Sequence, residues 1–390
     1  MRNLVLAAGA MVVAEAVQVL DQPHSSTYIG MGKVQEIANL VTAFHADLVV
    51  INVDLSGSQA RNLENECKLR VVDRTQVILD IFARRARSFE GKAQVKLAQL
   101  MYLLPRLSGQ GIQMSRLGGG IGTRGPGETK LEMDRRRIRQ EISNLRKIVD
   151  DEVERRSVSR RRRSRQGVYA VSLVGYTNAG KTTLLSGLAR RLGDRQMDAG
   201  QNRIFDTLDP TSRRIRWAGR TFVVTDTVGF IRELPHHLIN AFRSSLEAVE
   251  EADVVVHVVD ASSPFIQEEM ETVYQVMKES LADHAPVLTF FNKTDQLSEL
   301  NLTGDVHANA WIAGSALEEE TIIKLMEKLD ELVGHKIRMR LRIPFDRSDI
   351  IAILDQKGLV HHIQEDGQVY EVEAEVDERE AWQFAPFAGV

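Results

Sequence analysis

A glycine-rich segment near the middle of the chain has the residue types needed to bind phosphate. Residues 175–182 read GYTNAGKT and fit the pattern G-x-x-x-x-G-K-[ST]. The apolar run VYAVSLV precedes this segment and the helical pattern TTLLSGLARRL follows it. Glycines allow backbone N–H groups to face phosphate oxygens, a lysine supplies positive charge to the β- and γ-phosphates, and a threonine hydroxyl is a Mg²⁺ ligand. Lys181 and Thr182 are therefore predicted to take part in binding a nucleoside triphosphate with Mg²⁺.

A second motif, DTVG at residues 226–229, ends an apolar run about fifty residues further along. An aspartate in this place can hold Mg²⁺ through water, and the N–H of the glycine can meet the γ-phosphate. Asp226 is therefore predicted as a metal ligand through water. Gly229 is predicted to contact the reacting phosphate.

Two later motifs favour guanine over adenine. NKTD at residues 292–295 follows the apolar run VLTFF, and Ser315 and Ala316 follow a further apolar run. The Asp295 carboxylate can accept from guanine N1–H and N2–H₂, while Asn292 meets the acceptor edge; adenine offers no such donor pair. The order and spacing of the four motifs are those of translation-factor and Ras-like GTPases.

The segment RIFDTLDPTSRRI, between the first two motifs, is predicted to be switch I. A threonine of this segment completes the Mg²⁺ shell only when the γ-phosphate is present. Spacing alone leaves Thr207 and Thr211 open.

Phe230 stands directly after the DTVG glycine, where Ras-type GTPases have the glutamine that orients the attacking water. A phenylalanine cannot orient water, so slow hydrolysis is expected until a partner orders the switches. Asn178 has two interpretations: asparagines at this position in related GTPases coordinate K⁺, which can replace an arginine finger, or the side chain only braces the loop.

These motifs require a sheet to position them, and the chain divides into four predicted parts. They are a small parallel α/β domain (1–85), a helical hairpin with a basic linker (86–166), a doubly wound P-loop domain (167–334) and a small α+β tail (335–390). The P-loop domain is predicted from four buried-strand patterns: VYAVSLVG, TFVVTDT, DVVVHVVDAS and PVLTFFNKTD. The overall fold class is α/β.

The hairpin is predicted from two amphipathic stripes and carries a glycine-rich tip. Leu97, Leu100, Met101 and Leu104 recur at helical spacing, as do Leu131, Ile138, Ile142, Leu145 and Val149. Residues 117–129, LGGGIGTRGPGET, form the tip, which is longer than a simple turn needs and is suited to mould itself to a polyanion. A flexible connector is the alternative interpretation.

Charge and composition narrow the choice of partner and compartment. Residues 131–166 have 13 Lys/Arg against 7 Asp/Glu, although the net charge of the chain is −4. This basic segment is therefore the expected nucleic-acid contact, with a solvated charged linker as the alternative for residues 154–167.

A single cysteine favours a reducing compartment, and no apolar stretch could span a bilayer. The first 16 residues have a signal-peptide outline; we favour their assignment to a first core helix and strand that contain Leu4, Val5, Val12 and Val13.

Several longer stretches resemble the HflX family of ribosome-associated GTPases. They include YIGMGKVQEI, GGGIGTRGPGETKLEMDRRRI, GYTNAGKT, FDTLDPT and DTVGFIRELPHHLINAF. The resemblance covers residues 25–330 and implies a monomeric, cytoplasmic, partly membrane-associated Mg²⁺-dependent GTPase that binds GTP and GDP and acts on the large ribosomal subunit. It implies that the glycine-rich tip and residue 130 reach ribosomal RNA, and that stalled ribosomes are dissociated or rescued under stress, or that the protein acts in ribosome biogenesis.

The resemblance also selects Thr207 as the switch I magnesium ligand, beside Thr182 and Asp226. Lys181, Thr207 and Gly229 are the predicted catalytic residues. The predicted nucleotide-binding residues are Gly175, Tyr176, Thr177, Asn178, Ala179, Gly180, Lys181, Thr182, Phe205, Asp206, Thr207, Leu208, Asp209, Asp226, Thr227, Val228, Gly229, Asn292, Lys293, Thr294, Asp295, Ser315, Ala316 and Leu317.

The chain departs from this family in two places. Family members usually have a further strand before the helix that begins near Leu4, and the resemblance implies little about residues after 335.

Two other functions remain open: an RNA-binding or RNA-remodelling protein whose affinity is set by nucleotide, and a signalling GTPase with a protein effector. The positive charge of the hairpin has no use in the second of these.

Overall fold

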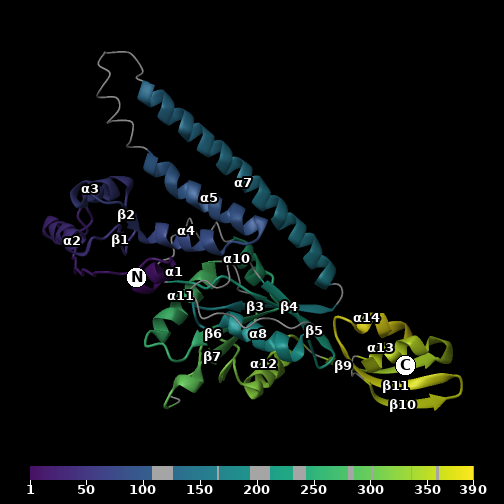
Figure 1. Cartoon of the computed structure of the whole chain (residues 1–390). Coiled ribbons are helices and arrows are strands. Elements are labelled where there is room, and N and C mark those ends of the chain that lie inside the picture. Colours follow the sequence, from purple (N-terminus) through teal and green to yellow (C-terminus); the bar gives the residue numbers. More distant parts are fainter. Residues whose placement is uncertain are drawn as a thin grey trace. The chain divides into compact units, whose positions relative to one another are not determined.

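The structure, a computed structural model, describes residues 1–107, 126–164, 167–193, 211–231, 243–279, 285–299, 302–334, 336–356 and 360–389 (Figure 1). The chain forms two compact units. The first comprises Met1–Val153 with Glu233–Arg243, and the second comprises Glu154–Arg232 with Ser244–Val390. Each unit is described by itself.

The first unit begins with a small parallel α/β domain. Its elements are α1 (Arg2–Ala7), α2 (Met31–Phe44), β1 (Val49–Ile51), α3 (Gly57–Cys67), β2 (Val71–Asp73) and α4 (Arg74–Arg85). Strands β1 and β2 pair in parallel. A capping box at Ser56 starts α3, and the Asp73 carboxylate caps α4 by accepting from the Gln76 N–H at 2.9 Å. The predicted parallel α/β arrangement is confirmed.

The beginning of the chain differs in part from the sequence prediction. Leu4 and Val5 are buried in α1, as expected of a core helix. Val12 and Val13 form no strand, and Val13 is 41% exposed. The segment therefore contributes one helix to this domain instead of a helix and a strand.

Helices α5 (Phe89–Arg106) and α7 (Pro126–Ser164) form the hairpin (Figure 1). Leu97 and Leu100 of α5 pack against Ile142 of α7, with Met101, Leu104, Ile138 and Leu145 around them. The two stripes predicted from the sequence therefore meet. The tip, residues 117–129, lies almost entirely outside the described residues, apart from the backbone of the first residues of α7.

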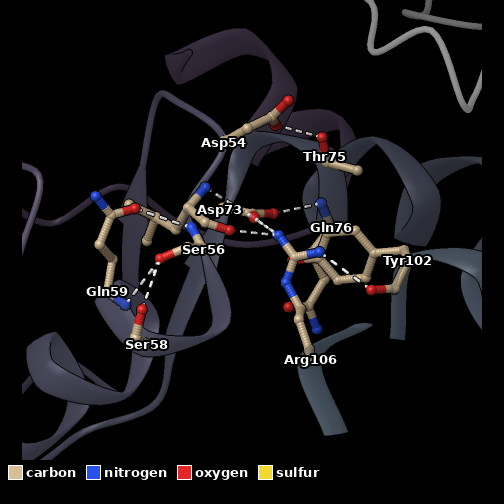
Figure 2. A network of polar contacts seen from close by, with 10 residues as sticks. Asp54, Ser56, Ser58, Gln59, Asp73, Thr75, Gln76, Tyr102 and Arg106 are labelled. Carbon is tan, nitrogen blue, oxygen red and sulfur yellow. Dashed lines mark hydrogen bonds and ion pairs between the residues drawn. The ribbon is translucent and has the colours of Figure 1, made fainter. Parts of the chain in front are cut away.

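A polar network ties the end of α5 to the parallel strands (Figure 2). The Arg106 guanidinium donates to the Asp73 carboxylate at 2.7 Å and to the Leu55 carbonyl at 2.6 Å, and lies 3.4 Å from the centre of the Tyr102 ring. Burial and the nearby Asp73 carboxylate raise the pKa of the Tyr102 hydroxyl. The last turn of α5 is thus fixed to the domain before it.

The core of the second unit is a six-stranded sheet of order β4-β5-β3-β6-β7-β8 (Figure 1). Its strands are β3 (Val168–Val174), β4 (Thr211–Trp217), β5 (Arg220–Asp226), β6 (Val254–Asp260), β7 (Val287–Asn292) and β8 (Ala310–Ala313). All neighbouring strands are parallel except β4, which pairs antiparallel with β5. Valine-rich runs form the central strands because both of their faces are buried.

Helices cover both faces of this sheet. They are α8 (Lys181–Leu192), α10 (Arg243–Glu250), α11 (Ile266–Glu279) and α12 (Glu319–Leu332), with a short 3₁₀ turn at Thr294–Gln296. Residues of α8 and α12, such as Leu188 and Leu325, share a core with Val256 and Phe222. Residues of α10 and α11 share another core with Val174 and Val255. The predicted doubly wound P-loop domain is therefore present, with two strands, β4 and β8, beyond the four predicted patterns.

A small α+β domain follows. It contains β9 (Lys336–Pro344), α13 (Ser348–Gln356), β10 (Val360–Asp366), β11 (Val369–Asp377) and α14 (Ala381–Phe384), with 3₁₀ turns at Phe345–Arg347 and Ala385–Phe387. Its antiparallel sheet has the order β10-β11-β9. The strands predicted around IRMRLRI and GQVYEVEAEV are confirmed as β9 and β11, and β10 was not anticipated.

A buried ionic cluster joins this small domain to the large sheet. Asp377 accepts a hydrogen bond from Arg220 Nε at 2.6 Å and from the Tyr169 hydroxyl at 2.6 Å. Arg220 is 4% exposed, and it also donates to Asp330 at 2.9 Å and to the Gly334 carbonyl at 2.9 Å. Tyr169 and Arg220 lie at the start of β3 and β5, so the cluster holds the ends of these strands that are furthest from the phosphate-binding loop.

Replacing Asp377 with alanine is expected to destabilise the second unit strongly. It would leave Arg220 buried without its closest carboxylate, a loss that costs about 3–5 kcal/mol. Tyr169→Phe removes one hydrogen bond and should cost only about 1 kcal/mol. Urea unfolding followed by tryptophan fluorescence measures the free energy of unfolding here, because Trp217, Trp311 and Trp382 all lie in this unit.

Glu365→Ala, on the exposed strand β10, is the matched control and should change the free energy of unfolding by less than about 0.5 kcal/mol. A value for Asp377→Ala as small as that of the control would mean that the cluster does not stabilise the unit.

Candidate nucleotide site

The phosphate-binding loop lies at the carboxyl end of β3 and leads into α8. Gly180 is the residue before α8, with a φ angle of +102°. A Cβ atom at this position would lie 2.1 Å from Asn292 Nδ2, so only glycine fits. The first N–H groups of α8 have no partner within the helix and form an anion site together with the loop.

Lys181 lies within this loop. Its ammonium group donates to the Gly175 carbonyl at 3.0 Å and to the Tyr176 carbonyl at 2.9 Å, and the residue is 6% exposed. Burial lowers the pKa of Lys181 to about 8, and the Asp226 carboxylate opposes this effect. The lysine is therefore held in place with its charge near the loop carbonyls.

The two predicted metal ligands that the structure describes lie side by side. The Thr182 hydroxyl donates to Asp226 Oδ2 at 2.7 Å, and Asp226 is completely buried at the end of β5. A hydroxyl and a carboxylate are the hard oxygen donors that Mg²⁺ prefers. The donor set therefore fits the Mg²⁺ ion on which GTPases generally depend.

The DTVG motif packs directly on the phosphate-binding loop. A Cβ atom on Gly229 would lie 2.9 Å from Thr177 Cα and 3.0 Å from Lys181 Nζ. The side chains of Thr227 and Val228 point into the protein, since both are buried and the Thr227 hydroxyl donates to the Leu173 carbonyl at 2.7 Å. Thr227 and Val228 therefore present no side chain to the phosphate-binding loop, and Gly229 is the residue of this motif that lies against it.

Phe230 lies in the core instead of facing the phosphate position. Its N–H donates to the Gly175 carbonyl at 3.1 Å, and its carbonyl accepts from the Thr177 N–H at 2.8 Å. The ring is 8% exposed and packs with Val174 and Val255. The backbone of Phe230 thus extends the pairing of β5 with β3, while its side chain is unable to orient water at the γ-phosphate.

The guanine-recognition motifs converge on the same loop. Asn292 Nδ2 donates to the Ala179 carbonyl at 2.8 Å, and Asn292 Oδ1 accepts from the Ala316 N–H at 2.9 Å. Asp295 is exposed, where its carboxylate is free to accept from a base. Ser315 is buried and Leu317 is 69% exposed, so Leu317 lies open at the rim of the site.

Lys293 shows a contact that the sequence did not reveal. Its ammonium group pairs with Asp260 Oδ2 at 2.6 Å, and its φ angle is +65°. Asp260 ends β6, the strand next to β7, so this pair joins the carboxyl ends of the two strands. In the sequence, Asp260 directly follows the apolar run VVVHVV, residues 254–259. An aspartate at the end of a predicted buried strand was the signal that could have indicated its place at this edge of the sheet.

The structure brings residues 175–182, 226–229, 292–295 and 315–317 to one edge of the sheet. Phe205, Asp206, Thr207, Leu208 and Asp209 lie outside the described residues. Thr211, the alternative switch I ligand, begins β4 and pairs with Asp226 across the strands. None of the helices in the described part of the chain is long and apolar enough to cross a bilayer.

Three family models match the chain in sequence order. Residues 1–83 match the GTP-binding GTPase N-terminal family, residues 85–163 match the GTP-binding GTPase Middle Region, and residues 170–293 match the 50S ribosome-binding GTPase family. The chain is 44% identical to GTPase HflX of Alkalihalophilus pseudofirmus over 368 residues, which cover 94% of this chain and 85% of the relative. The chain belongs to the HflX family of GTPases.

Other HflX family members span a wide range of organisms. GTPase HflX of Escherichia coli is 42% identical over 88% of this chain and 80% of its own length, and that of Thermococcus kodakarensis is 37% identical over 88% and 77%. Among solved structures, SsGBP in complex with GDP aligns over 85% of this chain and 93% of its own length, with 24% identity and a TM-score of 0.47. As an HflX family member, the chain binds guanine nucleotide and hydrolyses GTP.

The lowered pKa of Lys181 predicts a pH dependence of nucleotide affinity. Below about pH 8 the lysine of the free protein is protonated, and phosphate charges raise its pKa in the complex. Above pH 8, binding must therefore include proton uptake, and affinity for GDP should fall by up to about tenfold per pH unit. Titration with a fluorescent GDP analogue between pH 7 and 9.5 measures this.

Lys181→Met is the control: it should bind GDP more weakly, without this loss above pH 8. An affinity of the wild-type protein that stays constant through pH 9.5 would contradict the prediction.

Proposed function

We propose that this GTPase binds the large ribosomal subunit and hydrolyses GTP there, dissociating or rescuing stalled ribosomes under stress or acting in ribosome biogenesis. The observation that carries the proposal is the position of Phe230. Its ring is buried in the core with Val174 and Val255. Residue 230 of the free protein therefore cannot orient the attacking water as the glutamine of Ras-type GTPases does. A partner that orders the switches would supply what is missing.

Two further observations support a ribosomal partner. The family whose model matches residues 170–293 is described as a 50S ribosome-binding GTPase. The described part of helix α7 exposes six cations, namely Arg136, Arg137, Arg139, Arg146, Lys147 and Arg155. This concentration of positive charge suits the phosphate backbone of RNA.

We propose the same magnesium ligands and phosphate contacts that the sequence predicts. Thr182 and Asp226 hold Mg²⁺, the latter through water, together with Thr207, which lies outside the described residues. Lys181 and the Gly229 N–H contact the γ-phosphate. When bound, Mg²⁺ neutralises charge on the β- and γ-phosphates.

The network around Arg106 fixes the end of α5, the last described helix before the glycine-rich segment in the sequence. Arg106 is bound to Asp73 and to the Leu55 carbonyl of the preceding domain. We assign contact with ribosomal RNA to the glycine-rich segment, residues 117–129, and to Lys130. An RNA-binding protein in which nucleotide only sets affinity is the second candidate, favoured by the same exposed cations.

Steady-state GTP turnover, with and without purified large subunits at saturating GTP, tests the proposal. A rise of at least about a hundredfold is expected, equivalent to about 3 kcal/mol in the barrier. A chain that lacks residues 117–129 should lose most of this stimulation while it keeps its basal rate. Turnover that subunits leave unchanged would favour the RNA-binding candidate.

We further propose that Asn178 helps to bind K⁺ beside the phosphates. Asn178 adopts a φ angle of +67°, which places this loop residue in a conformation that asparagine tolerates well. A bound monovalent cation would supply the positive charge that other GTPases take from an arginine finger. Turnover should then be several-fold higher in KCl than in NaCl at equal ionic strength, and Asn178→Ala should abolish the difference. Equal rates in both salts would remove the ion from the mechanism.

A further inference from the structure

Strand β4 is the outer strand of the six-stranded sheet and has a run of arginines along it. Among the described strands it pairs with β5, and a single β-bridge joins its Ile215 to Gly193. Its sequence TSRRIRW places Arg213, Arg214 and Arg216 on one short strand. Ile215 is buried under α8, while Arg214 and Arg216 are exposed on the opposite face. The two exposed guanidinium groups are therefore alternate residues of an extended strand, about 7 Å apart along it.

These two arginines have no acidic neighbour across the strands. Arg214 pairs in register with Val223, and Arg216 pairs with Thr221. Within the described part of the chain, neither guanidinium forms an ion pair or a hydrogen bond. Their positive charge is thus available to a partner.

The arginines of β9 show the opposite arrangement and make the contrast clear. Arg338 lies 3.0 Å from Glu373, and Arg342 lies 3.5 Å from Glu371. Both strands carry arginines at alternate positions of one face, but only the arginines of β9 are paired in register with glutamates. The charge on β4 is therefore a specific property of this edge, and is not a general feature of the strands in this protein.

Hydroxyl side chains accompany these two arginines on their face of the sheet. Hydroxyl groups of Ser212, Thr221 and Thr225 lie on the face of Arg214 and Arg216. Arginine and hydroxyl side chains are among the groups that contact phosphate in nucleic acids.

We propose that the β4 edge, centred on Arg214 and Arg216, binds the phosphate backbone of RNA in the large ribosomal subunit. This inference rests on the proposed ribosomal function and names a contact surface for it. Guanidinium groups bind phosphate through paired, planar hydrogen bonds, and their spacing along an extended strand suits successive phosphates of a nucleic-acid strand. The outer strand of the sheet presents these two exposed residues without the bulk of a helix.

RNA bound at β4 would lie close in sequence to a segment that takes part in GTP hydrolysis. Strand β4 (Thr211–Trp217) contains the last five residues of the segment predicted as switch I, residues 203–215, and its first residue, Thr211, pairs with Asp226. RNA held by Arg214 and Arg216 would therefore lie within a few residues of the part of this segment that must order around Mg²⁺ and the γ-phosphate. Binding at this edge would link subunit docking to the order of switch I.

The first experiment measures the affinity of the Arg214→Gln/Arg216→Gln double variant for purified large subunits across a range of salt concentrations. Removal of two phosphate contacts should weaken binding about tenfold at 0.1 M salt and reduce the slope of log K against log salt by about 1.5. Affinity for GDP should stay unchanged. Arg338→Gln/Arg340→Gln is the matched control, with the same change of charge on strand β9.

The outcomes separate this inference from the function on which it rests. If wild-type protein binds subunits and the β4 variant shows the same affinity and salt slope, the RNA-binding edge is wrong. If that variant instead self-associates, the arginines serve only to prevent pairing between strand edges. Failure of wild-type protein to bind subunits would overturn the proposed function, and this contact with it.

A second experiment identifies the partner as RNA and not an acidic protein. The only cysteine of the chain, Cys67, is buried, so Ser212→Cys provides a single exposed thiol on β4 for a tethered iron–EDTA probe. Cleavage of ribosomal RNA by the probe on bound protein is the expected result, with the wild-type chain as the unlabelled control. Stable binding without RNA cleavage would exclude RNA as the partner of this edge.

Discussion

The parallel pairing of β3 with β5 is the constraint on which the rest of the second unit depends. Its register places Leu173 opposite Asp226, so the phosphate-binding loop and the DTVG motif leave the sheet together. The pairing continues past the strands, because Phe230 exchanges hydrogen bonds with Gly175 and Thr177. A shift of one residue would turn each side chain of β5 to the other face and separate Asp226 from Thr182.

The other end of the same two strands is held by a different kind of interaction. Tyr169 and Arg220 meet Asp377 of the small terminal domain in a buried cluster. Buried charges need both a partner and hydrogen bonds, and Arg220 obtains them from Asp377, Asp330 and a backbone carbonyl. The small domain is therefore part of the framework of the sheet.

The hydrophobic residue in the DTVG region has a structural explanation. Phe230 contributes its backbone to the loop and its side chain to the core, and both contributions hold the DTVG motif against Lys181 and Thr177. The phosphate-binding loop and the DTVG motif are therefore already packed together to bind nucleotide. The group that orients the attacking water must be one other than the side chain of residue 230. This arrangement is the basis of our proposal that hydrolysis depends on the large ribosomal subunit.

The sequence by itself determined the nucleotide chemistry, the doubly wound fold and the helical hairpin. Motif residues such as Gly180 and Asn292 have few alternatives at their positions, and strong apolar periodicity identified the central strands. The edge strand β4 was missed because its alternation of arginine with one buried isoleucine resembles a loop. The cluster of Tyr169, Arg220 and Asp377 was also invisible, since these residues are up to 208 positions apart in the chain.

Only the tertiary structure decided where charged side chains find partners. Arg220 and Arg214 look alike in the sequence, yet the first is buried with two carboxylates and the second is exposed without one. The direction in which Phe230 points was likewise settled by packing, because an apolar residue after DTVG is equally compatible with an exposed switch. Local sequence sets which chemistry is available, and long-range packing sets which groups are left free to perform it.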